Sequence, residues 1–201
     1  MNFTHPYSSP LGGITLVSDG ISLIGLLFDG QKYFPRTLGQ EHKEASLPVF
    51  EKACLWLDLY FSGEEPGFTP PLAIKSTEFR RSVWEILRSI PYGGTMTYGE
   101  IASKIAQQRN IPRMSAQAIG GAVGHNPIAL IIPCHRVIGA GGNLTGYAGG
   151  LEKKRKLLEL EKAAIQHSRY VMQGISQTPS PVSCTPKFPH HPAHFQWPAR
   201  R

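Results

Sequence analysis

Short apolar runs separated by turn residues dominate the first third of the chain. The apolar and β-branched positions of residues 14–34 are interrupted by Asp-Gly pairs at 19–20 and 29–30. Asp-Gly is a strong tight-turn signal between strands, so this pattern predicts a β-meander. Apolar positions then recur at helical spacing over residues 46–63, which predicts one helix that ends at a glycine.

Helical periodicity replaces the strand pattern beyond the proline-rich segment 64–73, which we interpret as the connection to a second domain. Predicted helices follow at 77–90, 98–108 and 115–124, with Thr77 and Ser115 as N-caps. The last two are short and closely linked, which is typical of a helix-turn-helix. The second of them contains Gly120 and Gly121, each costing about 1 kcal/mol relative to alanine, so we expect something to approach that backbone closely.

The last third of the chain holds a charged helix and then loses all periodicity. In the predicted helix 151–164, Leu151, Leu158 and Glu161 can share a face. Residues 166–201 have many prolines and no acidic residue, so we expect a disordered tail. Its histidines have no second ligand cluster beside them, and we assign no metal site.

Composition narrows the classes of partner. The chain is 41% hydrophobic with a net charge of +7, and residues 66–162 hold thirteen Lys/Arg against six Asp/Glu. Such a basic section favours a polyanion, and a solvated surface remains the alternative. No segment approaches the roughly 20 apolar residues of a membrane span, and the first residues do not resemble a signal peptide, so we expect an intracellular protein without a membrane partner.

Cysteine usage singles out one thiol. The three cysteines, Cys54, Cys134 and Cys184, are odd in number and widely spaced, which favours free thiols over a disulfide framework. Cys134 follows an apolar run and precedes a glycine-rich segment, as expected of a reactive group at the mouth of a pocket. A thiol reacts as thiolate, and His135 is adjacent in sequence, so we expect a charged sulfur with the histidine acting through a water. A structural Cys-His pair is the alternative.

These motifs together resemble the O6-alkylguanine-DNA alkyltransferases. The resemblance rests on PCHRV at 133–137, GHNP at 124–127, GYAGGLEKKRKLLELE at 146–161 and IPYGGTMTYGEIA at 90–102. It covers roughly residues 8–165. It implies an α/β fold with an N-terminal antiparallel sheet domain of ribonuclease H type at 1–68. A mainly helical domain with a winged helix-turn-helix follows at 69–165, and the tail occupies 166–201.

The resemblance implies a role for each candidate residue of the active site. Cys134 matches the acceptor that takes an alkyl group irreversibly from guanine O6, or from thymine O4, once per molecule and without a cofactor. His135 matches the base, and Glu161 the carboxylate that orients it. Asn126 matches a brace beneath the active-site segment, and Tyr98 a hydroxyl that faces the extruded base. Residues matching the substrate pocket are Val137, Tyr147, Ala148 and Gly149.

The same resemblance implies a monomer that binds double-stranded DNA through the minor groove and sits in the cytoplasm, or in the nucleus of a eukaryote. The residues expected to contact DNA are Arg113, Ser115, Gln117, Ala118, Gly121 and Arg136. Gln117 stands where the family often has an arginine that fills the gap left by the flipped base, so we expect weaker flipping or an altered lesion preference.

Two other functions remain open at the level of sequence. A non-enzymatic winged-helix protein, binding DNA or sensing alkyl lesions, would explain the helix pair and the charge but would not need Cys134. A thiol hydrolase would use the same cysteine and histidine but would need an oxyanion hole and repeated turnover. The zinc site of some relatives is not assigned, because the N-terminal cysteines it would use are absent.

Overall fold

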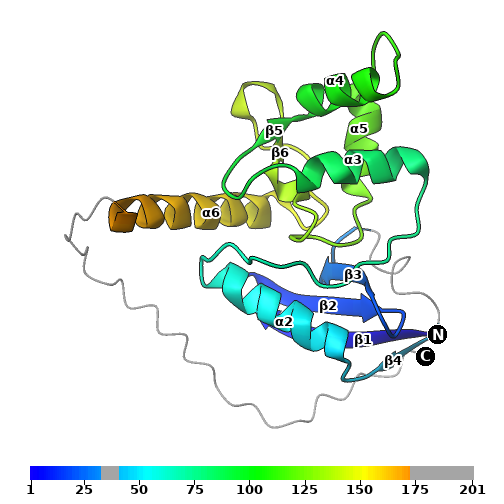
Figure 1. The fold of residues 1–201 in the computed structure, drawn as a ribbon, viewed down its shortest axis with the longest axis vertical. Coiled ribbons are helices and arrows are strands. Elements are labelled where there is room, and N and C mark those ends of the chain that lie inside the picture. The colour runs from blue at the N-terminus through cyan, green and yellow to red at the C-terminus, as the bar shows by residue number, and fades with distance from the viewer. Residues whose placement is uncertain (33–40, 173–201) are drawn as a thin grey trace.

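The computed structural model describes residues 1–32 and 41–172 (Figure 1). The N-terminal elements are β1 (Asn2–Ser9), β2 (Gly12–Ser18), β3 (Leu23–Phe28), β4 (His42–Glu44) and α2 (Pro48–Phe61). The C-terminal elements are α3 (Glu78–Arg88), β5 (Met96–Thr97), α4 (Tyr98–Gln108), α5 (Ala116–Gly124), η1 (Cys134–Arg136), β6 (Val137–Ile138), η2 (Ala140–Gly142) and α6 (Leu151–Met172). No helix in these two stretches is long and apolar enough to cross a membrane.

The N-terminal sheet has the order β3-β2-β1-β4, with α2 packed across it (Figure 1). The predicted meander is confirmed for β2 and β3, whose turn is held by the Asp19 carboxylate accepting the backbone N–H groups of Ile21 and Ser22 at 3.0 and 2.8 Å. The sequence did not predict β1, which contains Pro6. This proline is tolerated because the parallel pairing of β4 with β1 ends at Thr4, leaving Pro6 on an open edge.

The helical domain begins and ends its helices where the caps predict. Thr77 and Ser115 accept backbone N–H groups at the starts of α3 and α5, and Thr97 forms a capping box with Glu100 at the start of α4. The indole of Trp84 on α3 donates to the carbonyl of Ala122 on α5 at 2.9 Å. Helix α5 also packs against α4, as predicted for a helix-turn-helix, and its outer residues are exposed.

The two domains share one hydrophobic core and one backbone seam. In β3, the N–H of Leu26 donates to the carbonyl of Pro127, and the N–H of Ala129 donates back to Leu26, both at 2.9 Å. Buried side chains of α2, β3, α3 and the segment 128–132 form a single cluster. Residues 127–129, which pair with β3, directly follow Asn126. The N-terminal domain therefore supports the segment that leads to Cys134.

Helix α6 differs from its prediction in two respects. Leu151 is 49% exposed, so the face that it shares with Leu158 is buried only from Lys154 onward. The helix also continues to Met172, past the expected start of the tail at residue 166. The remainder of the predicted tail, with Cys184 and its histidines, lies outside the described residues.

Candidate active site

Cys134 opens the short helix η1, directly after the buried segment 128–132, and is 5% exposed. Asn126 fixes this segment with both ends of its amide. Its Nδ2 donates to the Ile132 carbonyl at 2.7 Å and to Cys134 Sγ at 3.2 Å, while its Oδ1 accepts the N–H of Ile128 at 3.0 Å. The predicted brace therefore contacts the sulfur itself, which gives Asn126 a direct influence on the thiol.

Burial raises the pKa of the Cys134 thiol above its ordinary value. The Asn126 hydrogen bond, the charge of Lys154 and nearby backbone amides lower it, but they do not outweigh burial. The thiol is therefore protonated in the resting protein, and the charged sulfur expected for the reaction is not its resting form. Its reaction requires a base that removes the proton when an electrophile is present.

His135 is fully buried, and its Nε2 lies 2.7 Å from Glu161 Oε1. Burial lowers the pKa of the imidazole despite the neighbouring carboxylate, so the ring is neutral at rest. Because a carboxylate only accepts, the proton of the neutral ring lies on Nε2. The Nδ1 lone pair makes no hydrogen bond with any residue in the described parts of the chain, which leaves it available as a base.

Glu161 has partners in two segments of the helical domain, η1 and the turn at Gly93. Arg136 donates to both carboxylate oxygens at 3.0 Å, and the N–H of Gly93 donates to Oε2 at 2.9 Å. Burial alone would raise the pKa of Glu161, but the hydrogen bonds from His135 and Arg136 and the charge of Arg136 hold it at about 2. The carboxylate stays ionised and keeps the imidazole oriented.

Arg136 was predicted to contact DNA, and the structure does not support that role. Its guanidinium is 9% exposed and engaged with Glu161 and with the Ile90 carbonyl, at 2.7 Å. A buried carboxylate needs a compensating charge, and Arg136 supplies it. The sequence could not reveal this, since the exposed side of a three-residue turn is set by contacts that are distant in sequence.

Lys154 is a site residue that the sequence analysis missed. It is fully buried on α6, with Nζ donating to the carbonyls of Val137 and Thr145 at 2.5 and 2.6 Å, and to Gly146 at 3.3 Å. Burial lowers its pKa to about 8, against the opposing influence of Cys134. The Lys154 ammonium thus donates to three backbone carbonyls, one in β6 and two in the loop after it. A signal was available, because Lys154 lies seven residues before Glu161 and hence on the same helix face.

Of the residues predicted for the pocket, Tyr98 and Tyr147 have pKa values raised by burial and lie near enough to Cys134 for its charge to raise them further. Tyr98 donates its hydroxyl to the carbonyls of Thr145 and Gly146 at 3.3 and 3.2 Å, and burial raises its pKa, with Cys134 adding to the shift. Val137 is buried, whereas Ala148 and Gly149 are partly exposed. A Cβ at Gly149 would lie 2.9 Å from the Tyr147 ring, so this glycine permits close packing of the loop.

The remaining residues expected to contact DNA share one exposed surface. Arg113, Ser115, Gln117, Ala118 and Gly121 are all exposed at the start and along the outer face of α5. A Cβ added to Gly121 would meet no heavy atom of the described residues within 4 Å. The glycine therefore leaves room on α5 for a partner from outside the chain.

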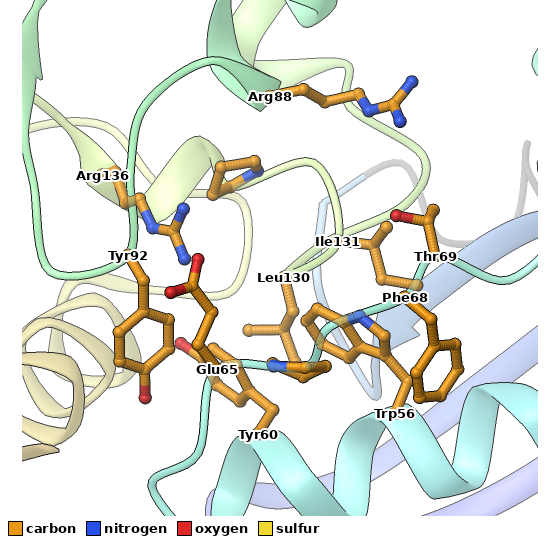
Figure 2. Close-up of a pocket in the computed structure, with 12 residues that line it drawn as sticks. Trp56, Tyr60, Glu65, Phe68, Thr69, Arg88, Tyr92, Leu130, Ile131 and Arg136 are labelled. Carbon is orange, nitrogen blue, oxygen red and sulfur yellow. The ribbon is translucent and has the colours of Figure 1, made fainter.

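Two further features of the structure bear on other chemistry. Within residues 1–32 and 41–172, no group of three His, Cys, Asp or Glu side chains is arranged to hold a metal ion. A small cavity of about 100 Å³ is lined by residues of both domains (Figure 2). Its lining includes Trp56, Tyr60, Tyr92 and Arg136, which connects it to the site described above.

Comparison with known proteins covers both domains. The models of 6-O-methylguanine DNA methyltransferase match as the ribonuclease-like domain over residues 3–74 and as the DNA binding domain over residues 78–163. The methylated-DNA–protein-cysteine methyltransferase of Haemophilus influenzae is 46% identical over 173 residues, which cover 86% of this chain and 90% of that protein.

Solved structures agree with this similarity. Mycobacterium tuberculosis O6-methylguanine methyltransferase is similar with a TM-score of 0.69 at 44% identity, covering 82% of this chain and 94% of that one. The M. tuberculosis OGT in complex with DNA gives a TM-score of 0.68 at 44% identity, covering 81% and 93%. The two-domain match and these relatives show that the chain belongs to the 6-O-methylguanine DNA methyltransferase family.

Proposed function

We propose that the chain repairs alkylated DNA by direct reversal, with Cys134 as the acceptor. It is a methylated-DNA–protein-cysteine methyltransferase, an enzyme that moves an alkyl group from DNA to a cysteine of its own. DNA is its partner, as for the M. tuberculosis relative. The observation that carries the assignment is a buried thiol held by Asn126 and followed in the chain by a histidine paired with Glu161 at 2.7 Å.

The transfer uses the groups around the sulfur in a fixed order. His135 Nδ1 takes the Cys134 proton through a water, and Sγ attacks the alkyl carbon in line with the bond to guanine O6. The S–C bond forms and the C–O6 bond breaks, with the electron pair staying on guanine. The guanine anion takes up one proton from water and protonated His135 returns one to water, so that unmodified guanine, a thioether and neutral His135 are the products. Tyr98 faces the base and supports its negative charge.

A base inside a duplex cannot reach a buried sulfur, so the guanine must be extruded, which costs a few kcal/mol. We propose that α5 enters the minor groove and that Gly121 and Ala118 allow its close approach. Gln117 occupies the place of the extruded base, and Arg113 contacts the phosphate backbone. One molecule acts as a monomer, in the compartment that holds the DNA.

The two alternatives predict different outcomes. A DNA-binding or lesion-sensing protein without catalysis has no use for a thiol with a base beside it, and a hydrolase would turn over many times. The stoichiometry of repair separates them. A duplex with one O6-methylguanine should lose one lesion per protein molecule and no more. Cys134→Ser should remove no lesions, whereas Cys54→Ser, which alters the half-buried free thiol of α2, should behave as wild type. Multiple turnovers would contradict the proposal.

A further inference from the structure

Tyr60 links the N-terminal domain to the His135–Glu161 pair. It lies on α2 and is fully buried, and its hydroxyl lies 2.9 Å from Glu161 Oε1 and 3.3 Å from His135 Nε2. Among the described residues, the other hydrogen-bond partners of Glu161 are Gly93, His135 and Arg136, all from the helical domain. Tyr60 is thus the contribution of the ribonuclease-like domain to this network.

The aromatic surroundings hold the Tyr60 ring in one position. Trp56 stacks on it with ring centroids 5.3 Å apart and an interplanar angle of 9°, and Tyr92 meets it edge-on at 6.0 Å. Figure 2 shows Tyr60 pointing from α2 toward Tyr92 and Arg136. A ring packed on both sides has little rotamer freedom to lose, so its hydroxyl is fixed before substrate arrives.

The hydrogen positions follow from the chemistry of the three groups. An ionised carboxylate only accepts, so the Tyr60 hydroxyl donates to Glu161 and directs its oxygen lone pairs toward His135 Nε2. An unprotonated Nε2 would place its lone pair against the oxygens of Tyr60 and Glu161, which is unfavourable. A protonated Nε2 can donate its hydrogen to these oxygens. Tyr60 and Glu161 therefore select the same tautomer of His135, which leaves the lone pair on Nδ1.

We propose that Tyr60 is a positioning residue for alkyl transfer, which holds the His135 imidazole in the Nε2–H tautomer and in the orientation that accepts the Cys134 proton. The inference rests on the proposed function, because it assigns His135 the role of base. It gives the N-terminal domain a part in the chemistry beyond supporting the fold. A tyrosine that only fills space would leave the tautomer and the transfer step unchanged.

The experiment compares Tyr60→Phe with Tyr92→Phe. Tyr92 belongs to the same aromatic cluster, and its buried hydroxyl has no hydrogen-bond partner among the described residues, so its loss tests packing alone. Single-turnover transfer from an O6-methylguanine duplex should slow about tenfold or more in Tyr60→Phe, as expected when a base loses its orientation. Affinity for the duplex should not change in either variant, and Tyr92→Phe should transfer at the wild-type rate.

Nitrogen-15 NMR of the imidazole reads the tautomer directly in the free protein. Wild type should show Nε2 protonated and Nδ1 bare, and Tyr60→Phe should shift both resonances toward each other. Wild-type transfer rates in Tyr60→Phe, or equal slowing in Tyr92→Phe, would overturn the inference. So would a wild-type His135 protonated on Nδ1, a result that needs no variant to fold. A wild-type protein that removes no methyl group would instead contradict the proposed function.

Discussion

Lys154 and Glu161 lie two turns apart on one face of α6, and both are fully buried. The lysine binds the carbonyls of the loop that follows Cys134, and the glutamate binds the histidine that precedes that loop. A single helix therefore anchors both His135, through a negative charge, and the segment that follows it, through a positive charge. Tilting this helix would disturb the base and the pocket together.

Lys154→Met should slow alkyl transfer by about tenfold or more, because the thiolate formed during reaction loses a nearby cation and the loop loses its anchor. In the wild type, the Lys154 pKa of about 8 means that the charge is present below that pH and lost above it. The transfer rate should therefore fall as the pH rises through 8. Single-turnover assays quenched at fixed times, from pH 6 to 10, measure the transfer rate at each pH. Lys156→Met, on the exposed side of the helix, is the matched control, and it should keep the wild-type profile.

Acid should destabilise the fold through Glu161 and His135. Both groups have pKa values below their ordinary ones, so the unfolded chain binds more protons than the folded chain. The free energy of unfolding therefore decreases as the pH is lowered. The His135 contribution is lost below about pH 6.5. The Glu161 contribution, about 3 kcal/mol for a pKa lowered from 4.5 to about 2, is lost as the pH falls through that range.

Urea unfolding at a series of pH values isolates the carboxylate. The decline of stability between pH 5 and pH 3 should be shallower in Glu161→Gln than in wild type. Glu159→Gln, which alters an exposed carboxylate on the same helix, should keep the wild-type slope. Equal slopes in Glu161→Gln and Glu159→Gln would show that the buried charge is not held as described.

Asn126→Ala should weaken both the fold and the reaction. It leaves the buried Ile128 N–H without its partner and removes one of the two donors to the Ile132 carbonyl, which costs about 1–3 kcal/mol. It also removes the donor to Cys134 Sγ, so the pKa of the thiol should rise further. Thermal unfolding and the rate of thiol alkylation by a small reagent measure the two effects. Asn143→Ala, at an exposed loop position, should change neither.

Gln117→Arg should improve repair in duplex DNA. An arginine at this exposed position of α5 adds a charge and a planar group that can stack in the gap left by the base. The transfer rate should rise for a duplex and stay unchanged for the free base O6-benzylguanine, which needs no extrusion. Gln108→Arg adds the same charge at the exposed end of α4. A similar gain in that variant would mean that general electrostatic attraction, not occupation of the gap, explains the improvement.

Local signals in the sequence predicted the elements, and contacts between distant segments explain what was missed. The helices were predictable because their caps and stripes lie within a few residues, as at Thr77 and Ser115. Strand β1 was missed because Pro6 argues against a strand, and only its pairing shows that the edge is open.

The site divides in the same way. Cys134, His135 and Asn126 stand in one short motif, and the structure pairs Asn126 with Cys134 Sγ and His135 with Glu161. Tyr60 comes from the other domain, 75 residues before His135, and no pattern along the chain links them. The direction in which Arg136 points was equally hidden, because its partner lies on α6.

The mass of one tryptic peptide tests the central claim most directly. Residues 114–136 lie between two cleavage sites and contain Cys134 as their single cysteine. After incubation with a duplex carrying O6-methylguanine, this peptide should gain one methylene in proportion to the guanine restored, with fragmentation placing the gain on Cys134. A restored duplex with an unmodified peptide, or a methyl group on any other residue, would contradict the account.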